Sequence, residues 1–342
     1  MIRVGIAGLG FMGKMHLRCY RDLEDVQVVA ICDTDPAKFE DTTGTAGNIE
    51  GAAAPLDFTG VQLYDRFDKM LTEASLDAVS ITLPTYLHKD HTIQALQAGV
   101  HVLCEKPMAA TVEQGREMAA QARQSGRRLQ VGHCIRFWPE YVKAKELIDS
   151  GRYGQVRAAT FQRLSLTPTW SWQNWILEAD KSGGAALDLH IHDADFVQYV
   201  FGMADQVFSR ATRGPSGGDD HIVTQYLYGD NRVITAEGGW IMAPSFGFQM
   251  SFHIVLAEAT IVYDCTRQPA FRVCPADGEA FSPEVFPGDG YSNEIAHFVR
   301  AVRGESVPEI ITPKQSVDSL RLVLAEQHSA ATGQIVRVDG RQ

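Results

Sequence analysis

The sequence lacks several features of secreted, membrane and nucleic-acid-binding proteins. Its six cysteines are scattered and include no Cys-x-x-Cys pair, which argues against a disulfide framework or a zinc site and favours reduced thiols. No apolar run approaches the roughly 20 residues that span a bilayer, and the chain opens on an expected strand rather than on a signal peptide. Its 31 basic residues are outnumbered by 42 acidic ones and form no basic stripe. We therefore expect a soluble, cytoplasmic protein without nucleic-acid or membrane partners.

The chain is long enough for two domains, with 342 residues of which 45% are hydrophobic. Its first 132 residues alternate short β-branched runs with helical stretches, which predicts an α/β domain with a parallel sheet and helices on both faces. The expected strands are residues 2–7, 26–32, 61–64, 77–82, 101–104 and 128–132. The segment 42–60 has no clear period, and we interpret it as a surface insertion or an extended loop.

A different pattern extends from residue 133 to residue 342. After a helix over 139–150, strands are expected at 156–166, 207–212, 221–228, 232–240, 248–256 and 260–264. Long alternating runs in series predict an α+β domain with a large, mostly antiparallel open sheet. Helices over 293–303 and 313–332 and a short strand over 335–338 are expected to close the chain, with the last helix packing back toward the first domain.

The first motif is a glycine-rich turn, Gly8-Leu9-Gly10-Phe11-Met12-Gly13. It follows a strand, opens a helix and is followed by Asp33 at the end of the second strand, and this context predicts a dinucleotide site. The glycines let the backbone approach a pyrophosphate at the start of the helix. Asp33 would accept hydrogen bonds from a ribose diol and repel a 2′-phosphate, so NAD is favoured over NADP. An ordinary tight turn with an N-capping aspartate is the alternative.

Charged residues follow the expected fifth strand. The run 101–104 is typical of a buried strand, and Glu105, Lys106 and Pro107 come directly after it. Because ligands bind at the carboxyl ends of parallel strands, Lys106 is expected to point toward a nicotinamide, with Glu105 able to pair with it or orient it. A solvated ion pair between Glu105 and Lys106 is the alternative.

The fourth strand ends in a similar way. Leu83, Pro84 and Thr85 follow it and precede His88, at the entry to a helix. At the carboxyl edge of the sheet these residues would line the cofactor site. For His88, a helix-capping role is equally compatible with the sequence.

A helix predicted after a Gly-Gly pair carries two histidines and three aspartates. Residues four apart share a helix face, so Asp188 and His192 form one polar pair, with Asp195 about one turn further, whereas His190 and Asp193 point elsewhere. Two histidines that are two residues apart cannot converge on one ion by helix geometry. We therefore predict no metal and interpret Asp188 and His192 as a proton-transfer pair.

These motifs, in this order, resemble the glucose–fructose oxidoreductase/inositol dehydrogenase (Gfo/Idh/MocA) family. The Cys-Glu-Lys-Pro signature and the downstream Asp-x-x-x-His are specific to it, and a late Tyr-Ser-Asn-Glu before a helix also fits. The resemblance covers nearly the whole chain and implies an N-terminal Rossmann domain followed by an α+β domain. It also implies NAD(P)-dependent oxidation or reduction of a sugar or polyol carbon by a dimer or tetramer.

The resemblance implies roles for individual residues. Lys106, Asp188 and His192 would be catalytic: His192 takes the hydroxyl proton as hydride leaves the same carbon for the nicotinamide, Lys106 stabilises the developing alkoxide, and Asp188 holds its neighbours. The sequence leaves open whether Lys106 or His192 is the formal base. The implied cofactor contacts are Gly8, Gly10, Phe11, Met12, Gly13, Asp33, Leu83, Pro84, Thr85, His88, Glu105, Lys106, Arg136 and Trp175. The implied substrate contacts are Lys106, His133, Trp172, Asp188, His192 and Tyr291.

One departure from the family pattern bears on the substrate. Relatives that act on inositol tend to carry two adjacent arginines after the sixth strand, whereas this chain has Ile135 and Arg136, which argues against inositol. Three indoles, Trp170, Trp172 and Trp175, could stack on pyranose rings, and Trp175 could instead wall the nicotinamide. For Trp170 and Trp172, a place in a core or a subunit interface is equally compatible with the sequence.

Two other functions stay open at this point. Some relatives hold NAD tightly and cleave a glycosidic bond through transient oxidation of the sugar, so a glycosidase without net redox is one alternative. A dinucleotide-bound sensor or scaffold without catalysis is the second. The presence of Lys106, Asp188 and His192 together argues against the sensor.

The second sheet is expected to mediate assembly, because it has more strand than its few helices can cover. Its uncovered face is expected to carry Val223, Gln225, Leu227, Ile234, Ala236 and residues 240–250. A large exposed apolar face generally marks an interface. Two such faces packed together would form a homodimer, or a tetramer made of two dimers.

Overall fold

The computed structural model describes residues 1–40 and 56–338 and divides into two compact units. The first unit comprises Met1–Cys134, Thr169–Ile176 and Gly290–Val317, and the second comprises Ile135–Pro168, Leu177–Asp289 and Asp318–Gln342. The boundary expected after residue 132 thus differs, because two later segments group with the first unit. Most of the predicted insertion at 42–60 lies outside the described residues.

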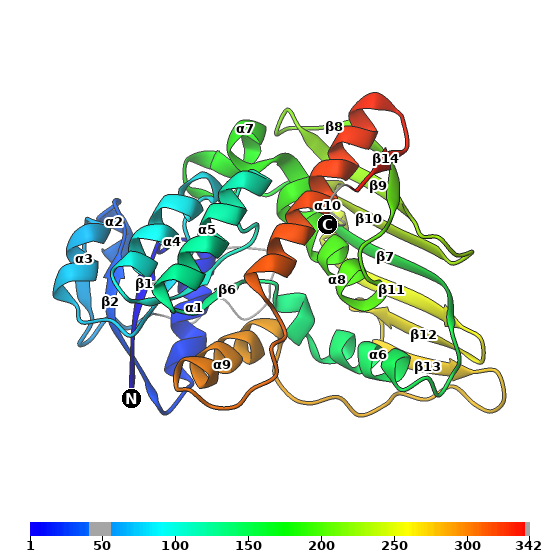
Figure 1. Cartoon of the computed structure of the whole chain (residues 1–342), viewed down its shortest axis with the longest axis horizontal. Helices are drawn as coiled ribbons and strands as arrows, with labels where there is room; N and C mark the ends of the chain where they lie inside the picture. Colours follow the sequence, from blue (N-terminus) through cyan, green and yellow to red (C-terminus); the bar gives the residue numbers. More distant parts are fainter. Residues whose placement is uncertain (41–55, 339–342) are drawn as a thin grey trace. The chain divides into compact units, whose positions relative to one another are not determined.

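The first unit contains a six-stranded parallel sheet, as predicted (Figure 1). Its order, β3-β2-β1-β4-β5-β6, changes direction between β1 and β4, where dinucleotides bind in sheets of this kind. Short apolar strands that are buried on both faces are typical of such a sheet. The strands are β1 (Ile2–Ala7), β2 (Val26–Cys32), β3 (Gln62–Tyr64), β4 (Ala78–Ile81), β5 (His101–Cys104) and β6 (Leu129–Val131).

Helices connect these strands and pack in pairs. Helices α4 and α5 lie against each other, and α1 lies against α9. Helix α5 begins at a Thr111 cap, whose hydroxyl accepts a hydrogen bond from Gln114 N, and ends at Gly126 in the left-handed conformation. The helices of this unit are α1 (Phe11–Arg21), α2 (Ala37–Glu40), α3 (Phe67–Glu73), α4 (His88–Gln97), α5 (Val112–Ser125) and α9 (Gly290–Val302).

Helix α9 explains why residues 290–317 group with the first unit. Its apolar residues Phe298 and Val299 are buried in one core cluster with Leu17 and Tyr20 of α1. The sequence placed this helix in the second domain, because a 3.6-residue periodicity reveals an apolar face without revealing the partner that covers it.

The second unit is built on an eight-stranded sheet of order β13-β12-β11-β7-β10-β9-β8-β14. The β7–β10 pair is parallel and the other pairs are antiparallel, which confirms the predicted mostly antiparallel sheet. Its strands are β7 (Val156–Leu166), β8 (Gln206–Arg213), β9 (Asp219–Leu227), β10 (Val233–Met242), β11 (Phe248–Leu256), β12 (Ala259–Asp264), β13 (Phe271–Pro275) and β14 (Val336–Arg337).

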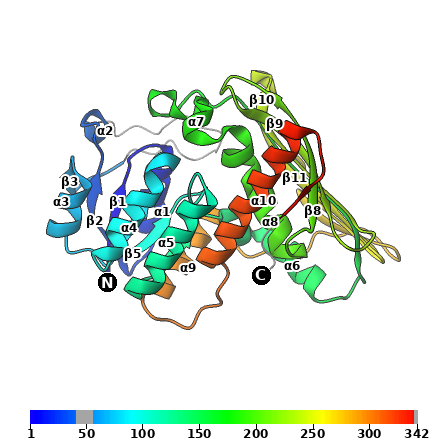
Figure 2. The same cartoon turned by 45° about the horizontal axis from the view of Figure 1, so that its top comes forward.

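One face of this sheet is covered by helices. Helix α8 (Ile191–Phe201) lies beside α10 (Pro313–Thr332), as Figure 2 shows, and Gln198 Nε2 donates a 2.8 Å hydrogen bond to Ser319 Oγ between them. Helix α6 (Pro139–Asp149) covers another part of the sheet.

Aromatic rings fill the core between α6 and the sheet. Tyr141 of α6 makes edge contacts with Phe196 of α8 and with Phe252 and Tyr263 of the sheet, at centroid distances of 4.9, 4.8 and 5.6 Å. Phe161 of β7 extends the same cluster. Such edge-to-face pairs stabilise a core beyond the area they bury.

The predicted uncovered face of the sheet is partly wrong in its residues. Ile234, Ala236 and Trp240 are buried, whereas Val223 is 44% exposed and Gln225 is exposed. The register explains this, because Ile234 of β10 pairs with the core-facing Tyr226 of β9 and not with Val223 or Gln225. Successive side chains alternate between faces, so a one-residue error in register moves a whole strand's side chains to the opposite face.

Two buried ion pairs join helix α8 to its surroundings. Asp193 accepts hydrogen bonds from Arg163 Nε and Nη2 at 2.8 and 3.2 Å, and Asp195 accepts from Arg136 Nε and Nη2 at 2.8 and 2.7 Å. All four side chains are buried. Their charges are therefore compensated by two-point contacts in a region with little water.

Replacing Asp193 by Ala is expected to lower the free energy of unfolding by about 3–5 kcal/mol, because it leaves the Arg163 charge buried without its carboxylate. Asp149→Ala is the control, since the Asp149 side chain is 57% exposed in its pair with Lys145, and it should cost less than about 1 kcal/mol. Urea unfolding measures both values. Equal losses in the two variants would contradict the prediction.

Candidate functional site

The glycine turn between β1 and α1 is shaped by close backbone contacts. Gly8 has φ +93°, and a Cβ at Gly13 would lie 1.9 Å from the Gly8 carbonyl oxygen, so neither position accepts an ordinary side chain. A Cβ at Gly10 would meet nothing within 4 Å. The turn is thus tightly packed at Gly8 and Gly13 and open at Gly10, where α1 begins without a side-chain cap. This arrangement fits a pyrophosphate held at a helix N-terminus.

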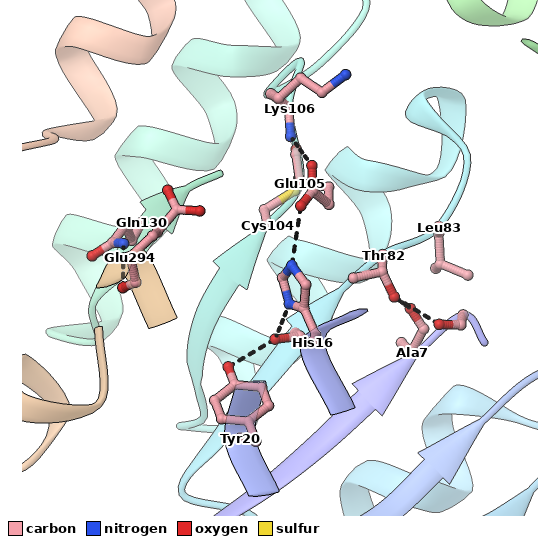
Figure 3. A network of polar contacts seen from close by, with 12 residues as sticks. Ala7, His16, Tyr20, Thr82, Leu83, Cys104, Glu105, Lys106, Gln130 and Glu294 are labelled. Carbon is pink, nitrogen blue, oxygen red and sulfur yellow. Dashed lines mark hydrogen bonds and ion pairs between the residues drawn. The ribbon is translucent and has the colours of Figure 1, made fainter. Parts of the chain in front are cut away.

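Thr82 supports this turn, although no motif in the sequence pointed to it. Its hydroxyl lies 3.0 Å from the Ala7 carbonyl oxygen and 2.7 Å from that of Gly8 (Figure 3). Thr82 follows β4 and so ties the end of that strand to the end of β1. The contact depends on strand order, which a local motif does not contain.

Asp33 lies beside the turn, as the dinucleotide motif predicts. Its Oδ2 accepts a 2.7 Å hydrogen bond from Leu9 N, and its Oδ1 accepts a 2.9 Å bond from Asp35 N. These main-chain donors orient the carboxylate at the end of β2. A negatively charged group held in this position fits a ribose diol.

The residues after β4 form a short 3₁₀ turn, Thr85–Leu87, that leads into α4. His88 is buried there, with Nδ1 2.8 Å from the Pro107 carbonyl oxygen and Nε2 2.7 Å from that of Leu83. Burial lowers the pKa of His88, although the two carbonyl oxygens oppose this. His88 therefore links the ends of β4 and β5 from within the protein. The alternative of a helix-capping role is wrong, because its ring contacts these carbonyl oxygens and α4 starts without a side-chain cap.

Glu105 and Lys106 follow β5 as predicted, but they differ in their surroundings. Glu105 is buried, and its Oε2 accepts a 3.1 Å hydrogen bond from the main-chain N of Lys106. Figure 3 shows the Lys106 side chain directed away from the Glu105 carboxylate. The alternative of a solvated Glu105–Lys106 pair is therefore wrong, and Glu105 contacts the lysine through its main chain.

A histidine that the sequence interpretation missed also contacts Glu105. His16 of α1 is buried, with its Nε2 3.0 Å from Glu105 Oε1 (Figure 3). Its one signal in the sequence is its place three residues after Gly13, in the helix that the glycine turn opens.

In the second unit, the helix predicted around Asp188 is formed and ends at Gly202, as expected. It starts with a π-helical turn, Ala186–His190, that contains Asp188 and precedes α8, on which His192 lies. Such π turns occur frequently at functional sites. As predicted, His190 points elsewhere: its Nε2 contacts Glu326 Oε2 at 2.7 Å.

Asp195 has a different place from the one expected, and its partner is Arg136. The sequence placed Asp195 with Asp188 and His192, but its carboxylate binds the Arg136 guanidinium and accepts a 2.6 Å hydrogen bond from Ser319 Oγ. Arg136 also lies 4.3 Å from the centroid of the Tyr199 ring. This buried arrangement stabilises the second unit, and a cofactor contact by Arg136 stays a prediction.

The remaining candidate residues belong to the first unit. Trp172 is partly exposed and is the first residue of a short turn, Trp172–Leu177, that also contains Trp175. Gln173 and Asn174 in this turn have left-handed backbone angles. His133 is buried. Tyr291, on α9, packs against the core cluster of the first unit. Their substrate and cofactor roles stay predictions.

The three expected catalytic residues come from both units. Lys106 follows β5 in the first, and Asp188 and His192 belong to the second. Lys106 and His192 stand in the local structure expected for them, whereas Asp188 lies in a π-helical turn and not in the expected α-helix. The convergence of the three on one substrate stays a prediction.

Over residues 1–40 and 56–338, no three His, Cys, Asp or Glu side chains are grouped so that they could hold a metal ion. Nor does any helix there have the length and apolar character needed to cross a membrane. The six cysteines, which all fall in these ranges, are free thiols.

Comparison with known proteins assigns both parts of the chain to one family. Residues 2–133 match the family described as "Oxidoreductase family, NAD-binding Rossmann fold", and residues 141–262 match "GFO/IDH/MocA C-terminal domain". The chain belongs to the Gfo/Idh/MocA oxidoreductase family, which confirms the resemblance drawn from the motifs. Its first unit has the NAD-binding Rossmann fold of that family.

Several proteins with known names are similar to the chain. The 1,5-anhydro-D-fructose reductase of Ensifer adhaerens is 29% identical over 282 residues, or 80% of this chain and 83% of the relative. The D-glucoside 3-dehydrogenase of Escherichia coli (strain K12) is 31% identical over 203 residues, or 59% of this chain and 54% of the relative. A solved structure of levoglucosan dehydrogenase, in complex with NADH and levoglucosan, has a TM-score of 0.83 at 21% identity over 99% of this chain and 100% of that chain.

Proposed function

We propose that this protein is an NAD-dependent dehydrogenase that transfers a hydride between a carbinol carbon of a sugar or polyol and the nicotinamide. The observation that carries the proposal is the strand order of the first unit. β1, β4 and β5 are parallel neighbours, so the glycine turn, residues 83–85 and Lys106 all follow strands at one edge of the sheet. In such a sheet this edge is the ligand-binding edge.

The residues of the first unit fit a dinucleotide. Gly8, Gly10 and Gly13 would let the main chain approach a pyrophosphate, and Asp33 would accept hydrogen bonds from a ribose diol. When bound, NAD supplies the nicotinamide carbon that accepts or returns the hydride. We assign NAD rather than NADP because Asp33 carries a negative charge where a 2′-phosphate would add two more.

The proposed roles of the protein groups follow from their chemistry. His192 takes the proton of the substrate hydroxyl, since imidazole exchanges protons near neutral pH. The Lys106 ammonium stabilises the negative charge that develops on the same oxygen. Asp188, four residues before His192, orients the histidine.

The proposed substrate is a cyclic sugar. The names of the relatives include an anhydrofructose reductase, a glucoside dehydrogenase and a levoglucosan dehydrogenase. The partly exposed Trp172 supports this class, because an aromatic face packs well against the C–H face of a pyranose ring. A panel of sugars and polyols with each nicotinamide cofactor, followed by absorbance of the reduced form, tests the proposal.

We also propose that the protein is cytoplasmic and assembles through its second sheet. Thiol cysteines suit a reducing compartment. Val223, Val233 and Ile241 are exposed on β9 and β10 of the sheet. An isologous contact between two such faces would bury them symmetrically.

Replacing Lys106 by Ala is expected to lower kcat about a hundredfold or more, because the charge that stabilises the alkoxide is lost. NAD binding, measured by fluorescence titration, should change little. Lys143→Ala, which removes a surface lysine paired with Glu146, should keep wild-type turnover. Substantial turnover by Lys106→Ala would contradict the assignment.

The specificity constant kcat/KM is expected to favour NAD over NADP by at least about tenfold, or about 1.4 kcal/mol, because of charge repulsion at Asp33. Asp33→Asn should reduce this preference, since it removes the charge and keeps the size of the side chain. A wild-type preference for NADP would refute the role of Asp33.

In solution the protein is expected to be a homodimer or a homotetramer, so light scattering should report a multiple of the 37.7 kDa chain mass. Val223→Glu should weaken this assembly by placing a charge in the interface. Leu63→Glu is a matched control, because Leu63 is also 44% exposed but lies on β3 of the first sheet. A wild-type monomer at micromolar concentration would overturn the proposal.

A further inference from the structure

We propose that His16 is a positioning residue for Lys106: it holds the buried Glu105 carboxylate in place, and Glu105 in turn holds the main chain of Lys106. The inference rests on the proposed catalytic role of Lys106. His16 lies on α1, the helix that the glycine turn opens. Its side chain is only 1% exposed and so does not contact a ligand itself.

The contacts form one continuous chain across three elements of the first unit (Figure 3). Tyr20 OH lies 2.8 Å from Ser80 Oγ, and Ser80 Oγ lies 2.9 Å from His16 Nδ1. His16 Nε2 lies 3.0 Å from Glu105 Oε1, and Glu105 Oε2 accepts from Lys106 N at 3.1 Å. This series of hydrogen bonds runs from Tyr20 on α1 to Ser80 on β4, returns to His16 on α1 and ends at Glu105 and Lys106 after β5.

The proton on the His16 ring is determined by its partner. An ionised carboxylate only accepts hydrogen bonds, so His16 Nε2 must donate to Glu105. With that proton on Nε2, the neutral ring accepts from Ser80 through Nδ1, and Ser80 accepts from Tyr20. Every buried polar side-chain atom in this series of hydrogen bonds then has a partner. A buried polar network is stable under this condition.

Glu105 needs this donor because it is buried. Burial alone would raise the pKa of Glu105, but the hydrogen bond from His16 and the charge of Lys106 lower it overall. The backbone of Gly132 also lies against this carboxylate, because a Cβ there would be 3.2 Å from Oε1 and 3.3 Å from Oε2.

The consequence for Lys106 is local. The residue follows the end of β5, and its main-chain N–H binds the carboxylate that His16 orients. His16 lies on α1, the helix that begins at the glycine turn. Its contact with Glu105 therefore links this helix to Lys106, the residue proposed to act on the substrate. A misplaced Glu105 would no longer hold the Lys106 main chain in this position.

The test compares His16→Leu, which removes the donor, with His16→Gln, whose amide can still donate at the position of Nε2. Glu105 is titrated directly by NMR of the ¹³C-labelled carboxyl group in the cofactor-free protein, with Glu105→Gln to assign the signal. We expect the Glu105 midpoint to rise by about one pH unit or more in His16→Leu and to be partly restored in His16→Gln. His190→Leu removes a histidine–glutamate pair that is equally buried but belongs to the second unit, and it should leave the Glu105 midpoint unchanged.

Kinetics supply the second readout. His16→Leu should lower kcat by about ten- to a hundredfold, as expected for loss of a charge-assisted hydrogen bond, and should move the acidic limb of the pH profile upward, while the dissociation constant for NAD changes little. If His16→Leu does not fold, His16→Asn takes its place, because its shorter amide falls short of Glu105.

Two results would overturn the inference. One is an unchanged Glu105 midpoint in the variants that lack the donor, and the other is a raised midpoint with wild-type kcat and pH profile. Failure of the proposed function is separate, since it would appear as turnover by Lys106→Ala while the Glu105 midpoint still responded to His16.

Discussion

The contact between Gly13 and the Gly8 carbonyl oxygen is the constraint on which the first unit depends. A Cβ at Gly13 would lie 1.9 Å from that oxygen, so α1 can start directly behind β1 only because no side chain is present there. The start of the helix sets which of its residues face the sheet. As a result, His16 and Tyr20 meet Ser80 on β4, and His16 reaches Glu105 after β5. One close backbone contact thus shapes both the glycine turn and the contact between His16 and Glu105.

Buried charge has the corresponding organising role in the second unit. Three of the five histidine and aspartate side chains in residues 188–195 contact charged partners. Asp193, Asp195 and His190 bind Arg163, Arg136 and Glu326, and these partners come from other elements of the same unit. Each pair would be costly to break, so together they favour one orientation of α8. In the proposed function, Asp188, on the π turn, and His192 take part in the chemistry.

The two sheets show why different parts of the chain were more or less predictable. In the first sheet the central strands are buried on both faces, so a short apolar run is enough to recognise them, and the parallel order follows from the alternation with helices. In the second sheet each strand has one core face and one open face. Identifying the strands of that sheet did not identify their faces, as Ile234 and Ala236 showed, because the face depends on register with a neighbour.

The sequence by itself determined the features that are encoded over a few residues. These include the glycine turn with Asp33, the charged residues that follow β5, the helix end at Gly202 and the different directions of His190 and Asp193. The physical reason is that the periods of helices and strands, and the backbone needs of glycine, act locally.

Only the tertiary structure decided which distant groups meet. His16 and Glu105 are 89 residues apart in the sequence, and Arg136 and Asp195 are 59 apart. A local pattern shows that a side chain will be buried, but its partner depends on strand order and on helix packing. For the same reason, the sequence did not show that α9 belongs to the first unit. That grouping depends on the packing of its apolar face against α1.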